Sequence, residues 1–151
     1  MITIIEGVDG TGKTTFAKRL AKENKSDYLH ADKPTHQTWY EEYLKPIKNT
    51  NMVLDRWHLG ELVWPIIYDR ESLFDEETFD LCNWTLAKLG TSLIILTRSD
   101  DEIANELLNR REDKEIELVL HAKELFMNAY KRIKYIDKKI VESGVVHVPN
   151  N

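Results

Sequence analysis

The sequence has little of several features that would point to particular classes of protein. It holds a single cysteine, Cys82, so no disulfide can form within the chain and no cysteine-based zinc site is encoded. No apolar run approaches the roughly 20 residues that a membrane-spanning helix needs. The formal net charge is −5, whereas proteins that grip long nucleic acids usually carry a basic excess. These absences predict a cytoplasmic protein with no membrane or nucleic-acid partner, whose first residues form a strand and not a signal peptide.

What the sequence does contain is a regular alternation of short apolar runs and amphipathic segments. At 151 residues the chain is long enough for one domain, and neither a linker nor a composition shift divides residues 1–151. The expected strands are 2–6, 28–31, 52–55, 92–97 and 145–148. The expected helices are 14–25, 36–48, 58–69, 75–89, 99–111 and 115–142. Short buried strands that alternate with helices predict an α/β fold in three layers, with a five-stranded parallel sheet and helices on both faces.

Glycine is scarce, but three of the six glycines lie within residues 7–12, in the segment GVDGTGKT. The segment matches G-x-x-x-x-G-K-[ST], the phosphate loop (P-loop) of nucleoside triphosphatases, at every fixed position. In such a loop, backbone N–H groups converge on a phosphate chain, the lysine reaches the β and γ phosphates, and the threonine hydroxyl holds Mg²⁺. A glycine-rich turn with an incidental lysine is the alternative, but this segment lies between a strand and a helix, where the mechanism needs it. ATP and Mg²⁺ are therefore the expected cofactors. The expected binding residues are Gly10, Thr11, Gly12, Lys13, Thr14 and Thr15.

Charged residues follow the expected strands, at the edge of a parallel sheet where ligands bind. Asp55 ends the third strand and could hold a Mg²⁺-bound water or accept a proton, while Arg56 offers a planar fork to a second phosphate. A surface ion pair is the alternative for these two residues. Arg110 and Arg111 end a helix, and a mobile lid over 99–116 would carry them to the phosphoryl group. A solvated helix end would also favour two arginines.

Four segments taken together resemble the thymidylate kinase family of nucleoside monophosphate kinases. They are IIEGVDGTGKTT, VLDRWH, RSDDEIANELLNRREDKE and LFMNAYKRI. The resemblance spans nearly the whole chain and is weakest in its middle third. It implies a kinase that transfers the γ-phosphate of ATP to a deoxynucleoside monophosphate, with dTMP or a related pyrimidine nucleotide as the acceptor. The chain also stops soon after the fifth expected strand, as small phage or viral kinases do, in which case it would act in the host cytoplasm.

The resemblance implies roles for individual residues. Asp9 would contact the sugar or phosphate side of the acceptor, and Arg56 would bind the acceptor phosphate. Asp55 would serve the metal, together with Thr14, or the attacking oxygen. Because the phosphate loop carries no arginine, the catalytic arginine beside Lys13 would come from the lid, as Arg110 or Arg111.

The chain departs from the family around its second strand and the following helix. It has Asp32-Lys33-Pro34 where the family has Arg-Glu-Pro, and Lys33 is a candidate for binding the substrate. Trp39 and Tyr43 are candidates for stacking on the base, although aromatic residues at helical spacing usually pack in the core. The resemblance also allows a homodimer. Its contact would be made by Leu62, Val63, Ile66 and Ile67.

Two other functions fit the same residues. One is a deoxynucleoside kinase or a kinase of modified pyrimidines, which are relatives with a similar acidic-arginine motif. The other is a P-loop switch or assembly factor that binds a nucleotide and has no acceptor. All three would act on small-molecule nucleotides or nucleosides.

Overall fold

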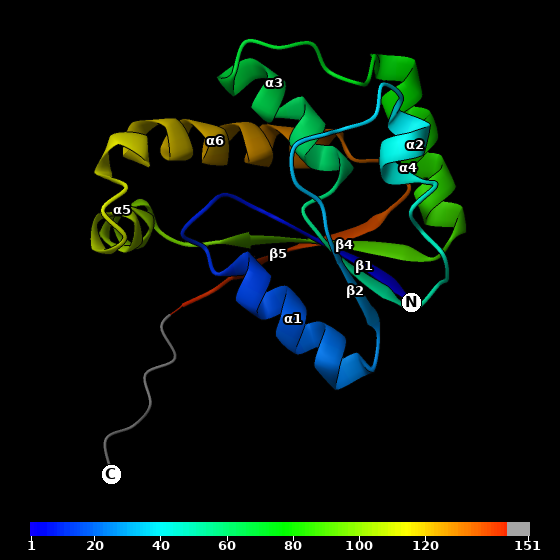
Figure 1. Cartoon of the computed structure of the whole chain (residues 1–151), viewed down its shortest axis with the longest axis horizontal. Helices are drawn as coiled ribbons and strands as arrows, with labels where there is room; N and C mark the ends of the chain where they lie inside the picture. Colours follow the sequence, from blue (N-terminus) through cyan, green and yellow to red (C-terminus); the bar gives the residue numbers. More distant parts are fainter. Residues whose placement is uncertain (145–151) are drawn as a thin grey trace.

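One parallel sheet forms the centre of the computed structural model, which describes residues 1–144. The strand order is β2-β3-β1-β4-β5, and all four neighbouring pairs are parallel (Figure 1). The strands are β1 (Ile2–Glu6), β2 (Asp27–His30), β3 (Met52–Asp55), β4 (Thr91–Thr97) and β5 (Asp137–Glu142). The predicted fold class, a parallel five-stranded sheet between helices, is confirmed.

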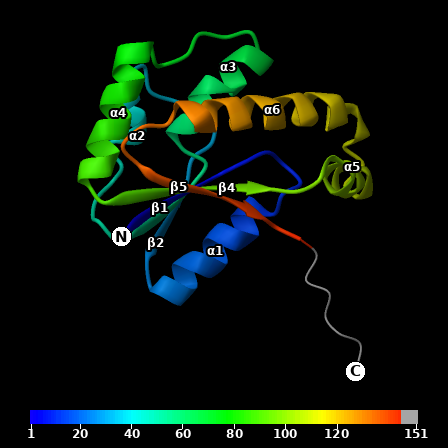
Figure 2. The same ribbon diagram turned by 180° about the vertical axis from the view of Figure 1, so that it is seen from behind.

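Helices cover the two faces of the sheet unequally. Figures 1 and 2 show α1 (Lys13–Asn24) alone on one face, and α2 (Trp39–Tyr43), α3 (Trp64–Ile67), α4 (Glu76–Lys88) and α6 (Ile116–Arg132) on the other. Helix α5 (Asp100–Asn109) lies beyond the end of the sheet, and two short 3₁₀ helices cover His58–Leu62 and Asp113–Glu115. Across residues 1–144, no helix combines the length and the apolar character that crossing a membrane would require.

Alternating side chains of the strands supply two separate cores. Ile4 of β1 is fully buried in the larger core, under α3, α4 and α6, whereas its neighbour Ile5 faces the smaller core. In that smaller core, Ile5 packs with Ala17 and Ala21 of α1, whose small side chains bring the helix close to the sheet. This alternation follows from the two-residue period of a strand and explains why β1 is buried along its whole length.

Two of the expected helix starts are confirmed in detail. The Asp75 side chain accepts a hydrogen bond from the Thr78 N–H, and the Thr78 hydroxyl accepts one from the Asp75 N–H. This reciprocal pair caps α4. Ser99 and Glu102 cap α5 in the same reciprocal way. Capping boxes of this kind satisfy N–H groups that the first helical turn leaves free. The first turn of the predicted lid is therefore fixed locally.

The prediction of one long helix over 115–142 is wrong in its last third, 133–142. Helix α6 ends at Arg132, Ile133 is extended, and Tyr135 adopts a left-handed φ of 70° that turns the chain back. Strand β5 then adds to the edge of the sheet beside β4. Because an edge strand is largely exposed, its sequence lacks the apolar run by which the inner strands were recognised. The strand expected at 145–148 lies outside the described residues.

Two other expected helices are shorter than predicted. Of 36–48, only α2 is helical, and 58–69 is split at Val63 into a 3₁₀ helix and α3, with Pro65 in the first turn of α3. Val63 is fully buried in the protein's own core, and of the four residues named for a dimer contact only Ile66 is exposed. A homodimer stays a prediction, and Val63 is not available to it.

Candidate active site

The phosphate loop joins β1 to α1 and needs glycine at defined positions. Gly7 has a φ of 141°, and a Cβ on it would lie 2.4 Å from the Leu96 carbonyl oxygen. Gly12 is left-handed (φ 78°) and precedes α1 without any side-chain cap. The first N–H groups of α1 consequently have no side-chain acceptor at the cap and face the loop. A helix start in this state is suited to binding a phosphate.

Asp9 holds together the two cations that were expected to bind different phosphates. Its Oδ1 accepts from Lys13 Nζ at 3.1 Å and from Arg56 Nη2 at 2.7 Å. Partial burial opposes ionisation of Asp9, but Lys13 and Arg56 hold its pKa below the ordinary value. Burial lowers the pKa of Lys13, as does the positive charge of Arg56, whereas Asp9 raises it. The three side chains form one charged cluster at the carboxyl ends of β1 and β3.

Arg56 reaches this cluster through an unusual backbone conformation. Its φ is 60°, which is rare for a residue other than glycine and costs about 1–3 kcal/mol. Its N–H still donates to the Ile5 carbonyl, so the turn begins directly at the end of β3. The Arg56 Nε is buried and has no hydrogen-bond partner among the described residues. A strained backbone conformation thus holds the Arg56 guanidinium in position, and one of its N–H donors has no partner among the described residues. These features suit the binding of an anion.

Asp55 is fully buried beside the phosphate loop. Its Oδ2 accepts from the Tyr28 hydroxyl at 2.8 Å and from His30 Nδ1 at 2.9 Å. Burial opposes its ionisation, but His30, the nearby Thr14 hydroxyl and Tyr28 hold the pKa of Asp55 below its ordinary value. Its Oδ1 is buried without a partner in the part of the chain that is described. An ionised carboxylate with a free oxygen next to a threonine hydroxyl fits the oxygen ligands that Mg²⁺ prefers.

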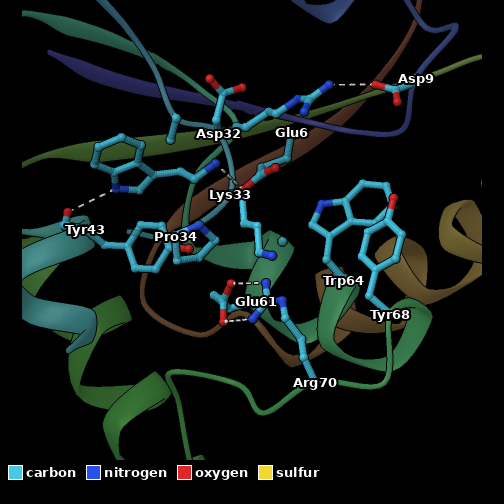
Figure 3. Close-up of a pocket in the computed structure, with 14 residues that line it drawn as sticks. Glu6, Asp9, Asp32, Lys33, Pro34, Tyr43, Glu61, Trp64, Tyr68 and Arg70 are labelled. Atoms are coloured by element: carbon cyan, nitrogen blue, oxygen red, sulfur yellow. Dashed lines mark hydrogen bonds and ion pairs between the residues drawn. The ribbon is translucent and has the colours of Figure 1, made fainter. Parts of the chain in front are cut away.

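A cavity of about 440 Å³ opens beside Arg56, and Lys13 is not among the residues that line it. Figure 3 shows its lining side chains. This volume is within the range of small-molecule sites. Its lining residues come from five parts of the chain: the end of β1 with the loop after it, the end of β3, the segment after β2, α2, and the segment 60–70. They are Glu6, Asp9, Ala31, Asp32, Lys33, Pro34, Tyr43, Arg56, Trp57, Gly60, Glu61, Trp64, Tyr68 and Arg70. The expected residues Asp9, Lys33, Tyr43 and Arg56 are thus brought together around one cavity.

The two candidate stacking residues occupy different places. Tyr43 lines the cavity, and its ring stacks on Phe74 with centroids 5.7 Å apart. Trp39 packs against Phe74 from another side, at 5.9 Å, and is not among the lining residues. The flat walls of the cavity come also from Trp64 and Tyr68, which stack on each other at 5.9 Å. Only Tyr43 of the expected pair faces the space that a base could occupy.

A second, smaller cavity of about 140 Å³ lies over the phosphate loop. Its lining includes Lys13, Thr14 and Thr15 of α1 and the side chain of Arg110. Arg110 reaches there from the end of α5 while it pairs with Glu106 at 2.9 Å. Arg111 is exposed and lines neither cavity. Of the two lid arginines, the structure brings only Arg110 to the phosphate loop.

The sequence analysis missed several lining residues of the large cavity. Glu61 and Trp64 lie within 58–69, which the spacing predicts as an apolar helix, whereas Glu6 ends the predicted strand 2–6 and Arg70 follows the predicted helix. The signal that was available is a charged residue, Glu61, inside an otherwise apolar run. Its burial and its partner depend on a turn that the sequence pattern does not reveal.

Comparisons with known proteins find the same architecture in solved structures. Neither the family models nor the curated proteins gave a match. The YorR protein of Bacillus subtilis, solved in complex with phosphorylated GDP, superposes with a TM-score of 0.81, at 22% identity over 96% of this chain and 87% of that chain. A thymidylate kinase from Candida albicans gives a TM-score of 0.55, at 14% identity over 95% of this chain and 84% of that chain. The fold is thymidylate kinase-like.

A third structure with this thymidylate kinase-like fold is deoxyadenosine kinase from M. mycoides with bound dCTP. It matches with a TM-score of 0.59, at 20% identity over 94% of this chain and 90% of that chain. The three solved structures that share the fold thus differ in the molecules named with them. At these sequence identities the similarity establishes the fold and not the substrate, so the identity of the acceptor has to be inferred from the residues of this chain.

Proposed function

We propose that this protein is an ATP-dependent nucleotide kinase that transfers the γ-phosphoryl group to the phosphate of a deoxynucleoside monophosphate. The observation that carries the proposal is the sharing of the Asp9 carboxylate by Lys13 and Arg56, at 3.1 and 2.7 Å. Because one carboxylate holds both cations close together, a phosphate bound by Lys13 and a phosphate bound by Arg56 would be close enough to react. The 440 Å³ cavity beyond Arg56 offers space for a nucleoside on the acceptor side.

In the proposed reaction, each residue acts on the part of the substrates to which it lies nearest. The phosphate loop and Lys13 hold the phosphates of ATP, and Arg56 holds the acceptor phosphate in line with them. Thr14 and Asp55 would hold Mg²⁺, which when bound offsets charge on the β and γ phosphates. An oxygen of the acceptor phosphate forms a bond to the γ-phosphorus, and the bond from that phosphorus to the β–γ bridging oxygen breaks, which leaves ADP and a diphosphate. Arg110 approaches from the lid to stabilise charge on the moving group.

The nature of the acceptor has a first candidate and an alternative. The resemblance in sequence makes dTMP or a related pyrimidine monophosphate the first candidate. A deoxynucleoside acceptor is the alternative, favoured by the likeness to deoxyadenosine kinase. Arg56 supports the monophosphate, because a guanidinium beside the reacting groups suits an anionic acceptor better than a neutral hydroxyl.

The test is formation of ADP from Mg·ATP in the presence of a panel of deoxynucleosides and their monophosphates. We expect ADP to form only with an acceptor, and a monophosphate to be preferred. Lys13→Ala should lower kcat by about 100-fold or more, because it removes a charge that acts on the transferred group. Arg56→Ala should raise the KM of the acceptor at least about 10-fold and leave the KM of ATP nearly unchanged.

Arg19→Ala, an exposed arginine on the outer side of α1, is the matched control and should leave both constants unchanged. ADP that forms at the same rate without any acceptor would support a switch or assembly factor instead. Equal losses of ATP and acceptor affinity in Arg56→Ala would contradict the division of the two phosphate sites.

A further inference from the structure

A partly buried ion pair lies in the wall of the large cavity and shares no residue with the charged cluster of Asp9, Lys13 and Arg56. Arg70 Nη2 donates to Glu61 Oε1 at 2.6 Å, and Nη1 donates to Oε2 at 3.1 Å. The Leu73 N–H donates to Oε2 at 3.0 Å, which is the third hydrogen bond to the Glu61 carboxylate, and Arg70 Nη1 also donates to the Glu71 carbonyl at 3.0 Å. The hydrogen bond to Glu61 raises the pKa of Arg70. The guanidinium is therefore held in one plane and one orientation, and is always charged.

The two partners are unequally available to a ligand. The side chain of Glu61 is 1% exposed, whereas that of Arg70 is 24% exposed. A molecule in the cavity would meet the arginine and not the carboxylate. The contacts described above use both hydrogens of Nη1 and one of Nη2, which leaves Nε–H and the second Nη2–H. These two donors lie side by side on one edge of the guanidinium.

The surroundings suit a flat ring that accepts hydrogen bonds. In Figure 3, Arg70 lies between Glu61 and the indole of Trp64, which itself stacks on Tyr68. Lys33 lines the same cavity and adds a further donor. Gly60 leaves room for the indole, since a Cβ there would come within 3.1 Å of Trp64. With Glu61 covered, this end of the cavity offers donors and planar apolar walls.

Two parallel donors select bases by the arrangement of their acceptors. Guanine presents O6 beside N7, and cytosine presents O2 beside N3, so each can accept both N–H groups. In thymine the N3–H donor separates the two carbonyl oxygens, and in adenine N7 is flanked by the amino group. A thymine or an adenine therefore presents no two adjacent acceptors of this kind and leaves one of the two N–H groups facing a donor, a C–H or a methyl group, which is unfavourable.

We propose that Arg70, oriented by Glu61, reads the base of the acceptor, and that the site selects guanine or cytosine over thymine and adenine. This specificity rests on the proposed kinase function, because it concerns the acceptor of that reaction. It moves the preferred substrate away from dTMP, while dCMP remains a related pyrimidine nucleotide. Arg70 is a binding residue for specificity, and Glu61 acts through it as a positioning residue.

The test uses the wild-type protein first. Binding of dGMP, dCMP, dTMP and dAMP is followed by tryptophan fluorescence, since Trp64 lines the cavity, and ADP formation is measured with the same four. We expect dGMP or dCMP to bind at least about 10-fold more tightly than dTMP and dAMP. The analogue that replaces one acceptor of the preferred base by C–H, 7-deaza-dGMP or 3-deaza-dCMP, should lose about 10-fold. Whichever of dGMP and dCMP binds more tightly shows whether the site selects guanine or cytosine.

Variants then assign the effect to Arg70. Arg70→Lys keeps the charge but loses the planar pair of donors, and should reduce the discrimination between the preferred base and dTMP by about 10-fold with the KM of ATP unchanged. Because an unpaired Glu61 could destabilise the protein, the double variant Glu61→Gln/Arg70→Gln keeps a neutral hydrogen-bonding pair and should show the same loss. Arg19→Gln is the control and should behave as the wild type.

Preference for dTMP or dAMP, equal binding of all four, or full binding of the deaza analogue would overturn the base assignment. Unchanged discrimination in both Arg70 variants would overturn the role of Arg70. Either result leaves the kinase function standing if any monophosphate supports ADP formation. If no acceptor supports ADP formation, the kinase function fails and the binding measurements still decide the base preference.

Discussion

At the scale of single residues, Glu6 shows how position in the fold changes the chemistry of a side chain. It ends β1, lines the large cavity and is 1% exposed. Burial raises its pKa to about 8, although the N–H groups of Trp57 and Gly60 and the charges of Lys13 and Arg56 oppose the shift. Its Oε1 accepts from the Trp57 N–H at 2.7 Å. A proton on Glu6 is therefore favoured at neutral pH, and this side chain adds little negative charge to the large cavity.

We expect Glu6→Gln to flatten the dependence of stability on pH. Between the ordinary pKa of 4.5 and about 8, folded Glu6 keeps a proton that the unfolded chain releases. The free energy of unfolding therefore falls as the pH rises through this range. Glutamine cannot titrate and still offers an oxygen to Trp57, so the variant should exceed the wild type in stability by a margin that grows up to about pH 8.

Urea denaturation at pH 5, 6, 7 and 8 measures this margin. Glu23→Gln on the exposed side of α1 is the matched control, because its side chain is 64% exposed and should show the wild-type slope. Parallel profiles for Glu6→Gln and the wild type would contradict the assigned protonation.

Sequence alone predicted residues of the site where neighbours in the chain are also neighbours in space. The phosphate loop, and Asp55 with Arg56, are contiguous motifs, so their residue types and order predict their placement at the ends of β1 and β3. Glu61 and Arg70 are nine residues apart and meet only because the chain turns after α3. No period in the sequence encodes that turn, so the sequence pattern does not predict this half of the large cavity.

At the scale of elements, local signals predicted the helices that begin with caps and failed at the end of α6. Ser99 and Asp75 mark the first turns of α5 and α4 within a few residues of sequence. Ile133 and Ile136 continue the helical spacing of α6 and are buried, yet they lie outside the helix. Both side chains reach the core from an irregular turn. Their spacing in the sequence therefore resembles that of a helix although this segment is not helical. Tertiary packing decided this boundary.

We expect Ser99→Ala to destabilise α5 by about 1 kcal/mol, because the first turn loses its side-chain acceptor. Hydrogen exchange of the amides in 100–109 should become faster, and the lid would present Arg110 less often over the phosphate loop, which lowers kcat. Mass-resolved exchange of the lid peptide and steady-state kinetics check the two effects.

Asp75→Ala removes an equivalent cap from α4, which carries no residue of either cavity, and is the matched control. It should speed exchange in 76–88 and leave kcat unchanged. Protection of 100–109 that stays at the wild-type level in Ser99→Ala would show that tertiary contacts alone hold the lid.

At the scale of the whole molecule, the end of β5 is tied to the phosphate loop near the start of the chain. The Ser143 hydroxyl donates to the Thr11 carbonyl at 2.6 Å. Arg98, directly after β4, donates from Nε to the Ser143 carbonyl at 2.8 Å and from Nη1 to the Gly10 carbonyl at 3.1 Å. Two neighbouring strands thus fix the outer side of the loop. The backbone amides that would face ATP depend on a residue more than a hundred positions away.

We expect Ser143→Ala to weaken ATP binding several-fold, because the loop loses a bond that orders its backbone, and to leave the KM of the acceptor unchanged. Titration with a fluorescent ATP analogue and the two KM values measure the effect. Ser26→Ala removes a hydroxyl that bonds Asn51 at the opposite edge of the sheet, and should have no effect on either constant. Equal changes in the ATP and acceptor constants would indicate a general loss of stability and not a local one.

The bridge made by Asp9 also bears on which anions the resting protein retains. With its carboxylate between Lys13 and Arg56, the molecule supplies its own counterion, and inorganic phosphate or sulfate must compete with a tethered group for both cations. A nucleotide brings further contacts from its base and sugar and so displaces that group more readily than a small anion does. In the proposed kinase, the shared carboxylate would therefore disfavour binding of abundant inorganic ions by Lys13 and Arg56.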